Sequence, residues 1–453
     1  MFVALVGAGA AATIASWLRR RPQRGVLLLA ALLPFNGLLQ LLPHHGGISA
    51  WKEGLVLLTL ACALFAPEAA RATPDRRPPA WALPAAGLVF LGIVSLATTA
   101  SGAGRIGFKV TYFYYLLPVI IWRCPFSARE RDRLVTILMT TSVATAAFGI
   151  VQQILGGERL HQLGFEWNTA LRTSGGRLRS ISTFSQPFPF AFFVTMALLI
   201  GLPVALADVN RRRNLFFLLS SPVLIFGMLT AIVRGAIIGL AAGLVYLALS
   251  RHRALLHLAV VAVVVVLMLP GGFLKVLTSS SSLGQRQSGW GRTAGLIAER
   301  PLGWGLGTVG AAAEKAFPVP DDSTPSFGLP IKDLPYQPDN QYVNIGLQLG
   351  VLGLWLFVLV LRGAYKEGRR ISTLPTPADA ALGAGITASI IAAVVGALVA
   401  TYWEIFPLDA YFWMILGVLL SIGRVSPSTP WPSAPAAAGF RPTSESSSEP
   451  SPV

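Results

Sequence analysis

Long apolar runs alternate with short polar segments along most of this chain. A helix that spans a membrane needs about 20 apolar residues, with a range of roughly 17–25. The pattern predicts an all-α polytopic membrane protein with about 12 to 13 transmembrane helices, of which the two shortest are tilted, partial or re-entrant. The predicted runs are 2–18, 25–43, 50–66, 81–99, 107–122, 134–155, 187–207, 214–230, 235–250, 254–274, 342–361, 380–400 and 408–423, with 107–122 and 235–250 the shortest.

One extended polar interruption, residues 275–341, separates the last apolar runs from the rest. A large ordered loop against a helical bundle is a suitable place for the chemistry of a membrane enzyme, so this loop is the first candidate site. We predict one transmembrane domain, 1–425, that includes this loop. Residues 426–453 are rich in Pro, Ser and Ala, and we expect them to form a disordered cytoplasmic tail.

Composition agrees with a membrane protein and argues against a nucleic-acid partner. The chain is 53% hydrophobic and 12% charged, whereas about a quarter of the residues of a soluble domain are charged. The net charge of +16 is explained by Lys and Arg at the cytoplasmic ends of helices. Two cysteines and five histidines show no spacing for a disulfide framework or a metal site, so we expect no metal and no cofactor.

The distribution of Lys and Arg predicts how the chain crosses the membrane. Alternate segments hold 22 of these residues in short, dense groups and 14 in much longer loops. The dense set marks the cytoplasmic side. It consists of 19–24, 67–79, 123–133, 208–213, 251–253, 362–370 and the tail after 424. The long loops 156–186 and 275–341 are therefore expected to face outside.

Two groups of arginines lie on the predicted outer side. Arg172, Arg177 and Arg179 fall within eight residues, just before the run at 187. Arg234 lies between two apolar helices with almost no loop around it, where an arginine costs about 2.5–3.5 kcal/mol at the centre of a span. These arginines are either solvated or interfacial side chains, or they bind phosphate oxygens in bidentate fashion.

The polar loop holds two further candidates. Arg286 precedes a stretch with helical spacing, and a run of Gly303, Gly305 and Gly307 follows, without the strand and lysine that a phosphate-binding loop needs. Asp339 lies at the mouth of the next apolar run. It is either a general base for an alcohol nucleophile or a helix cap, and both roles remain open.

Four blocks in this order resemble the O-antigen ligase and O-antigen polymerase superfamily of bacterial envelope glycosyltransferases. They are Ser182 to Pro187, Leu229-Thr230 with Val233 to Ala236, Trp290 to Gly307, and Asp339 to Tyr342 with Leu349 to Gly353. The blocks span about 180–355. Two positions depart from the family pattern, because Val233 replaces the usual serine and Asp339 replaces the histidine that is common in ligases.

The resemblance implies a C-type glycosyltransferase fold in the bacterial inner membrane, with a large loop and an active site that face the periplasm. It implies an undecaprenyl diphosphate-linked oligosaccharide as the donor, contacts with membrane lipid and no metal. By this resemblance Arg179, Arg234 and Arg286 bind the diphosphate, and Asp339 activates the acceptor hydroxyl. We assign further substrate-binding roles to Arg177, Asn340, Tyr342 and Glu299.

The acceptor is not evident from the sequence. Asp339 in place of histidine favours a polymerase that extends a lipid-linked repeat unit. The alternative is a ligase that transfers the finished glycan to lipid A core or protein. A chain-length regulator or other polysaccharide-assembly proteins are expected partners.

A lipid-linked oligosaccharide flippase is an alternative of another class, but it predicts repeated halves and charges within several spans, which this chain does not display.

Overall fold

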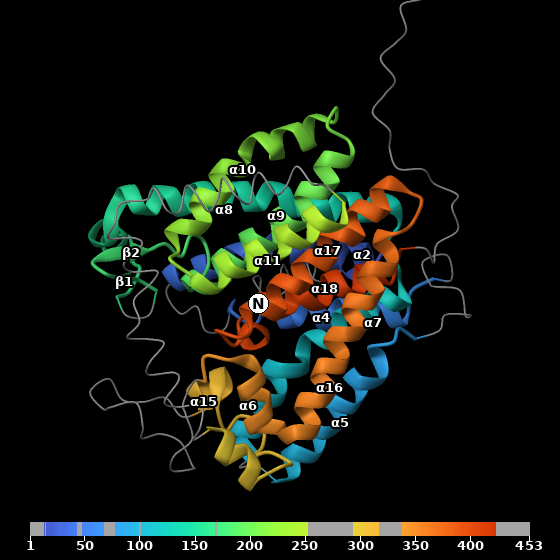
Figure 1. Ribbon diagram of the computed structural model, residues 1–453, viewed down its shortest axis with the longest axis vertical. Coiled ribbons are helices and arrows are strands. Elements are labelled where there is room, and N and C mark those ends of the chain that lie inside the picture. Colours follow the sequence, from blue (N-terminus) through green and yellow to red (C-terminus); the bar gives the residue numbers. More distant parts are fainter. Residues whose placement is uncertain are drawn as a thin grey trace, which may run out of the picture.

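Helices make up almost all of the described chain, as the apolar runs predict (Figure 1). The computed structural model describes residues 13, 15–42, 48–67, 78–98, 101–167, 170–251, 293–316 and 338–422. The first half holds α2 (Gln23–Leu32), η1 (Leu33–Leu41), α4 (Trp51–Leu64), α5 (Ala82–Thr98), α6 (Ser101–Tyr112), η3 (Phe113–Tyr115), α7 (Leu116–Arg123) and α8 (Ala128–Gln162). The second half holds β1 (Arg172–Ser174), β2 (Arg177–Arg179), α9 (Pro187–Ala207), α10 (Arg212–Thr230), α11 (Arg234–Ser250), α15 (Gly310–Ala316), α16 (Gln341–Ser372), α17 (Pro377–Gly396), η4 (Tyr402–Glu404) and α18 (Leu408–Leu419).

The centre of the bundle is α9, which is buried on all sides. Its sequence is apolar all round, and such a helix belongs in the interior. It packs against α8, α10, α11 and α17. Small residues let these helices approach closely, since a side chain on Gly239 of α11 would meet the carbonyl oxygen of Ala392 on α17.

A second group of helices surrounds the first half of α16. Figure 1 shows α5, α6 and α15 beside this part of α16, apart from the layer of α8, α9, α10 and α11. The contacts agree, because α16 packs against α5 and α17, and α15 packs against α6. A small antiparallel hairpin, β1–β2, lies at the end of α8.

Six helices in the described part of the chain are long and apolar enough to cross a membrane. They are Gln23–Leu41, Ala128–Gln162, Pro187–Ala207, Arg212–Thr230, Gln341–Ser372 and Pro377–Gly396. Three shorter apolar helices lie among them, and the class of all-α polytopic membrane protein is confirmed. The predicted runs 2–18 and 254–274 fall mostly or wholly outside the described residues, as does the predicted tail 426–453. The full count and the disordered tail therefore stay predictions.

Several predicted runs differ from the helices observed, and two of them show why. The run 107–122 is not one helix, because the aromatic stretch at Phe113–Tyr115 forms a 3-10 turn between α6 and α7. The run 134–155 is only the middle of α8. This helix begins earlier, at Ala128, because a capping box precedes it, in which Ser127 and Glu130 satisfy each other's backbone N–H groups.

Several of the described segments assigned to the cytoplasmic side contact one another or their neighbours at one end of the bundle. Hydrogen bonds join Gln23 to the carbonyl oxygen of Pro125 at 3.1 Å, and Arg251 to that of Ser372 at 3.3 Å. An ion pair of 2.9 Å joins Arg131 to Asp379. These contacts agree with the alternation read from Lys and Arg, and which end faces the cytoplasm stays a prediction.

Asp132 holds the α9–α10 turn to α8 at this end. Its carboxylate accepts hydrogen bonds from Arg211 at 2.6 Å and from Arg213 at 2.8 Å, and all three side chains are largely buried. We expect Asp132→Asn to lower the free energy of unfolding by about 2 kcal/mol, because two partly buried cations lose their counter-charge. Thermal unfolding of the detergent-solubilised protein measures this.

The matched control for Asp132 is Glu367→Gln. Glu367 pairs with Arg370, whose side chain is 49% exposed, and such surface pairs contribute about 0–1 kcal/mol. An equal shift in the unfolding temperature for both variants would contradict the assigned role of Asp132.

Candidate active site

The hairpin β1–β2 presents its arginines on one face. Arg172 lies directly opposite Arg179 in the pairing, and Ser174 lies opposite Arg177, so all four side chains share that face. Leu178 points the other way and packs in a small apolar cluster with Phe165 and its neighbours. Like charges directly opposite each other on two strands are destabilising. An anion bound between them would offset this repulsion.

The hairpin contacts the junction of α10 and α11, which carries Arg234. The guanidinium Nε of Arg179 donates to the carbonyl oxygen of Ala231 at 3.3 Å, and the backbone N–H of Ser180 donates to the carbonyl oxygen of Thr230 at 3.0 Å. Burial lowers the pKa of Arg179, and the positive charges of Arg172 and Arg234 lower it further. We call Arg172, Arg179 and Arg234 the arginine cluster.

Backbone strain accompanies this cluster. Ile232, two residues before Arg234, is buried with φ +53°, and Ser182, three residues after Arg179, has the same φ. A β-branched residue in this region is a genuine outlier, and such strain persists only where the surroundings hold it in place. Helix α8 holds Ser182 in this conformation. The backbone N–H of Ser182 donates to the side chain of Gln152 at 2.7 Å, and the hydroxyl of Ser182 donates to the carbonyl oxygen of Thr145 at 2.6 Å.

The glycine-rich segment 301–307 fills a break in α16. Gly350 interrupts this helix with φ +69°. The N–H groups of Trp304 and Gly305 donate to the freed carbonyl oxygens of Leu347 and Gln348, at 2.7 and 3.0 Å, and the N–H of Val351 donates to Pro301 at 2.9 Å. Backbone groups that leave a helix need such partners. The segment therefore has a structural role in joining the loop to α16.

A buried polar network lies beside this break and ends at Glu404. Gln348 accepts from the N–H of Gly307 at 2.8 Å, is hydrogen-bonded to Asn344, and donates to one carboxylate oxygen of Glu404 at 2.9 Å. The other oxygen of Glu404 accepts from the N–H of Ala311 at 3.0 Å. Burial raises the pKa of Glu404, and these hydrogen bonds oppose part of that shift.

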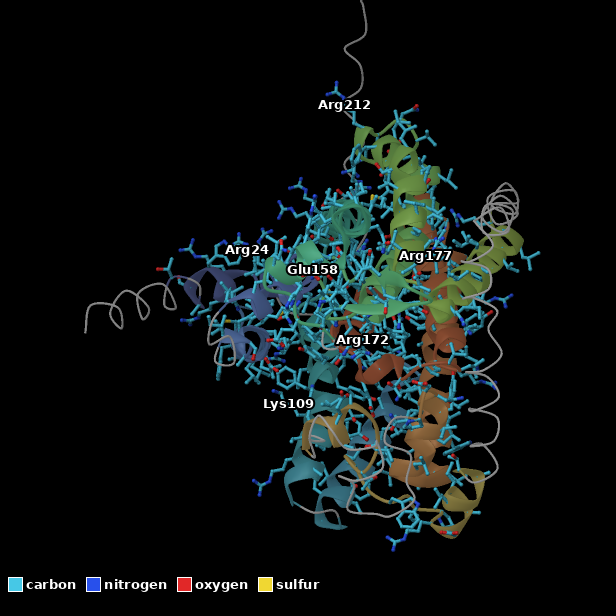
Figure 2. All side chains as sticks on the ribbon, turned by 90° about the vertical axis from the view of Figure 1, so that its left-hand side faces the viewer. Arg24, Lys109, Glu158, Arg172, Arg177 and Arg212 are labelled. Carbon is cyan, nitrogen blue, oxygen red and sulfur yellow. The ribbon has the colours of Figure 1, made fainter. Side chains whose placement is uncertain are left out.

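A cavity of about 550 Å³ opens above Glu404, and we call it the outer cavity. Four parts of the chain meet around it, namely β1, the start of α9, α15 and the linker between α17 and α18. Its lining residues are Arg172, Ser185, Gln186, Ala311, Glu314, Lys315, Thr401, Glu404, Ile405 and Phe406. Figure 2 looks onto this end of the molecule, where Arg172 lies between Arg177 and Lys109. Within the described ranges, no three His, Cys, Asp or Glu side chains gather as metal ligands would.

The predicted site residues fall into two groups. Arg179 and Arg234 come together in the arginine cluster, and Arg177 lies exposed on the same face of the hairpin. Glu299 is exposed on a helical segment, 293–299, that packs on α16. Arg286 lies outside the described residues.

In the block at Asp339, the carboxylate of Asp339 is exposed, whereas Asn340 and Tyr342 make structural hydrogen bonds. Asp339 is exposed and does not line the outer cavity. Asn340 caps α16, because its side chain accepts from the N–H groups of Tyr342 and Val343 at 2.9 and 3.2 Å. The hydroxyl of Tyr342 donates to the carbonyl oxygen of Val394 at 2.8 Å. The cap is thus made by Asn340, so Asp339 is not needed for it.

Lys315 and Glu404 were given no role from the sequence, and Arg172 was considered there only as one of the arginines before the run at 187. The signal for Arg172 was its place in the arginine group before the run at 187. The signal for Glu404 was a single acidic residue in the short linker between two apolar runs, on the predicted outer side. Neither signal indicates that the two residues face one cavity.

Comparison with known proteins adds two findings. Residues 215–358 match the family model described as O-antigen ligase. This range contains Arg234 and Asp339, whereas the hairpin and Glu404 lie outside it. An O-antigen polymerase of Salmonella muenchen is 23% identical over 266 residues. That alignment covers 54% of this chain and 62% of the relative, so the chain spans less than two thirds of the relative's length.

Proposed function

We propose that this chain, whose similarity to the O-antigen ligase and polymerase superfamily both comparisons support, is a polysaccharide polymerase. It transfers a glycan from undecaprenyl diphosphate to a lipid-linked repeat unit at the outer face of the bacterial inner membrane. The observation that carries the proposal is the arginine cluster at one end of a membrane-type bundle, next to a cavity.

The arginine cluster suits a diphosphate better than a single phosphate or a carboxylate. Planar guanidinium groups bind phosphate oxygens in bidentate fashion. Three of them, from β1, β2 and the start of α11, provide more positive charge than one phosphate neutralises. Arg177 on the same face and Arg286 in the outer loop remain further predicted ligands, and Glu299, Asn340 and Tyr342 remain predicted substrate-binding residues.

The reaction requires one bond to form and one to break. The oxygen of an acceptor hydroxyl attacks the anomeric carbon of the donor sugar, and the bond from that carbon to the diphosphate oxygen breaks. The electron pair stays on the diphosphate, whose growing negative charge the arginines stabilise, and this electrostatic contribution is usually the largest in catalysis. The hydroxyl proton passes to a carboxylate, for which Asp339 is the proposed base.

A ligase is the second candidate, since the matched family model is described as O-antigen ligase. It differs only in the acceptor, which is lipid A core or protein in place of a lipid-linked repeat. Asp339 at the position where ligases commonly have histidine favours the polymerase, and the relative named O-antigen polymerase agrees with that choice. A chain-length regulator or other assembly proteins are proposed partners.

Deletion of the gene separates the two enzymes. The polymerase proposal predicts that long glycan disappears while single-repeat material remains. If full-length polymer accumulates on the lipid carrier instead, the protein is a ligase and the proposal fails. The purified protein in detergent must also lengthen a lipid-linked repeat unit, and a flippase would produce no such product.

A further inference from the structure

We infer that the outer cavity binds the sugar of the acceptor, and that Glu404 hydrogen-bonds to the hydroxyl groups of that sugar. The inference rests on the proposed function, because it names the second substrate's place in the same site. It goes beyond the arginine cluster, since Glu404 lies outside the matched family range and is held by hydrogen bonds from Ala311 and Gln348.

The position of Arg172 links the cavity to the donor site. Arg172 is opposite Arg179 in the hairpin and also lines the outer cavity. A diphosphate held by the arginine cluster would therefore place the attached sugar at the mouth of the cavity. The acceptor must reach that sugar, and the cavity that Arg172 lines provides space for it.

The lining has the chemistry that a polyhydroxylated ligand needs. The carboxylates of Glu314 and Glu404 accept hydrogen bonds, Gln186 both donates and accepts, and the hydroxyl of Ser185 does the same. Phe406 contributes an aromatic ring at the same surface. A volume of about 550 Å³ lies within the range of about 300–1,000 Å³ that is usual for ligand sites.

Glu404 is held rigidly enough to select a ligand. Glu404 is only 5% exposed. One of its carboxylate oxygens accepts a hydrogen bond from the N–H of Ala311, and the other accepts one from the side chain of Gln348. A carboxylate has about four lone-pair sites, so it can accept from a ligand as well. A buried carboxylate is costly unless its hydrogen bonds are complete. A site built in this way around a substrate hydroxyl discriminates strongly against a ligand that lacks it.

The competing explanation is that Glu404 only joins α15 and the 301–307 segment to α16. That role predicts that Glu404→Gln lowers stability and kcat but changes the KM for the donor and the KM for the acceptor to the same extent. The acceptor role predicts instead that the KM for the acceptor rises about tenfold or more, while the KM for the donor stays within about twofold. Ser185→Ala removes a hydroxyl from the exposed rim and does not touch the network, so it should raise the acceptor KM by a smaller factor with unchanged stability.

The experiment uses the full-length protein in detergent. The lipid-linked repeat unit is supplied in two differently labelled forms, one as the donor and the other as the acceptor. Binding of the free repeat-unit oligosaccharide is measured in parallel by saturation-transfer NMR, without donor. Glu158→Gln, the same change at an exposed glutamate of α8, is the control. We expect oligosaccharide binding to be lost in Glu404→Gln and retained in Glu158→Gln.

The outcomes separate the two proposals. If no variant or wild-type protein transfers glycan, the proposed function fails, and the binding measurement still tests the cavity. If transfer occurs but neither Glu404→Gln nor Ser185→Ala changes the acceptor KM or the binding of the oligosaccharide, the acceptor assignment is wrong. If Glu404→Gln does not fold, Ser185→Ala decides on the same two measurements.

Discussion

Replacing Arg234 with alanine is expected to lower the kcat of glycan transfer by about 100- to 1,000-fold, the range seen when one preorganised donor to a developing charge is removed. Arg234 is the first residue of α11, and Ile232, two residues before it, has a strained backbone that persists only where the surroundings hold it in place. Its charge also acts on Arg179, so the loss reduces the positive potential of the whole cluster. Transfer is measured with purified protein and lipid-linked donor.

Two further variants make the Arg234 result specific. Arg234→Lys keeps the charge but loses the bidentate geometry, so it should retain part of the lost activity. Arg159→Ala removes an exposed arginine in the last turn of α8 and should leave kcat unchanged. A loss of activity in Arg159→Ala as large as in Arg234→Ala would show that general positive charge at this end, and not the cluster, matters.

Gly350→Ala is expected to have the largest effect on stability, a loss of about 4 kcal/mol or more. Gly350 has φ +69°, and a Cβ there would overlap the carbonyl oxygen of Pro301. Strain at such a backbone position costs about 1–3 kcal/mol. Displacing Pro301 would also break the hydrogen bonds of Trp304, Gly305 and Val351, each worth about 1 kcal/mol.

The matched control is Gly295→Ala. Gly295 lies in the helical segment 293–299, and a Cβ there would meet no atom within 4 Å. Alanine in a helix is favoured over glycine by about 0.8–1.0 kcal/mol, so this variant should be as stable as the wild type or more so. Thermal unfolding in detergent checks both, and equal unfolding temperatures would refute the role of Gly350.

The length of the apolar runs predicted α9, α10 and α11 well. The run 187–207 corresponds to α9, Pro187–Ala207, and the runs 214–230 and 235–250 differ from α10 and α11 by two residues or fewer. Length and apolar composition decide these helices, because a spanning segment must satisfy its own backbone groups. The rule does not predict the polar turns that extend a helix beyond its apolar run. The last turns of α16, up to Ser372, carry Arg369 and Arg370 and lie beyond the predicted run 342–361.

The hairpin was not predicted, although a local signal for it exists. Gly175 and Gly176 have φ values of +57° and +74° and form the two-residue turn between β1 and β2. Two glycines flanked by short strands are typical of such a turn. The strands have only three residues each, too few to show an alternating pattern in the sequence. The pairing of Arg172 with Arg179 depends on this turn and therefore remained hidden.

The roles of the glycines in 303–307 also depended on a distant partner. Gly303, Gly305 and Gly307 all have positive φ. The sequence argued against a phosphate loop, but it did not indicate that the segment fills the break at Gly350. That contact joins residues more than 40 positions apart, and its hydrogen bonds are between backbone groups that carry no sequence signature.

Local composition was enough to predict the class of the protein, because burial in lipid requires long apolar segments. Sequence motifs alone led to the resemblance to a glycan transferase. The sidedness that the Lys and Arg pattern indicates stays a prediction. The sequence also identified Arg179 and Arg234, whose charge is unusual for the predicted outer side. The packing of separate helices was needed to show that Arg172 lies with Arg179 and Arg234, that Asn340 makes the cap, and that Glu404 lines one cavity with Arg172. These are long-range relations, and they depend on how separate helices pack.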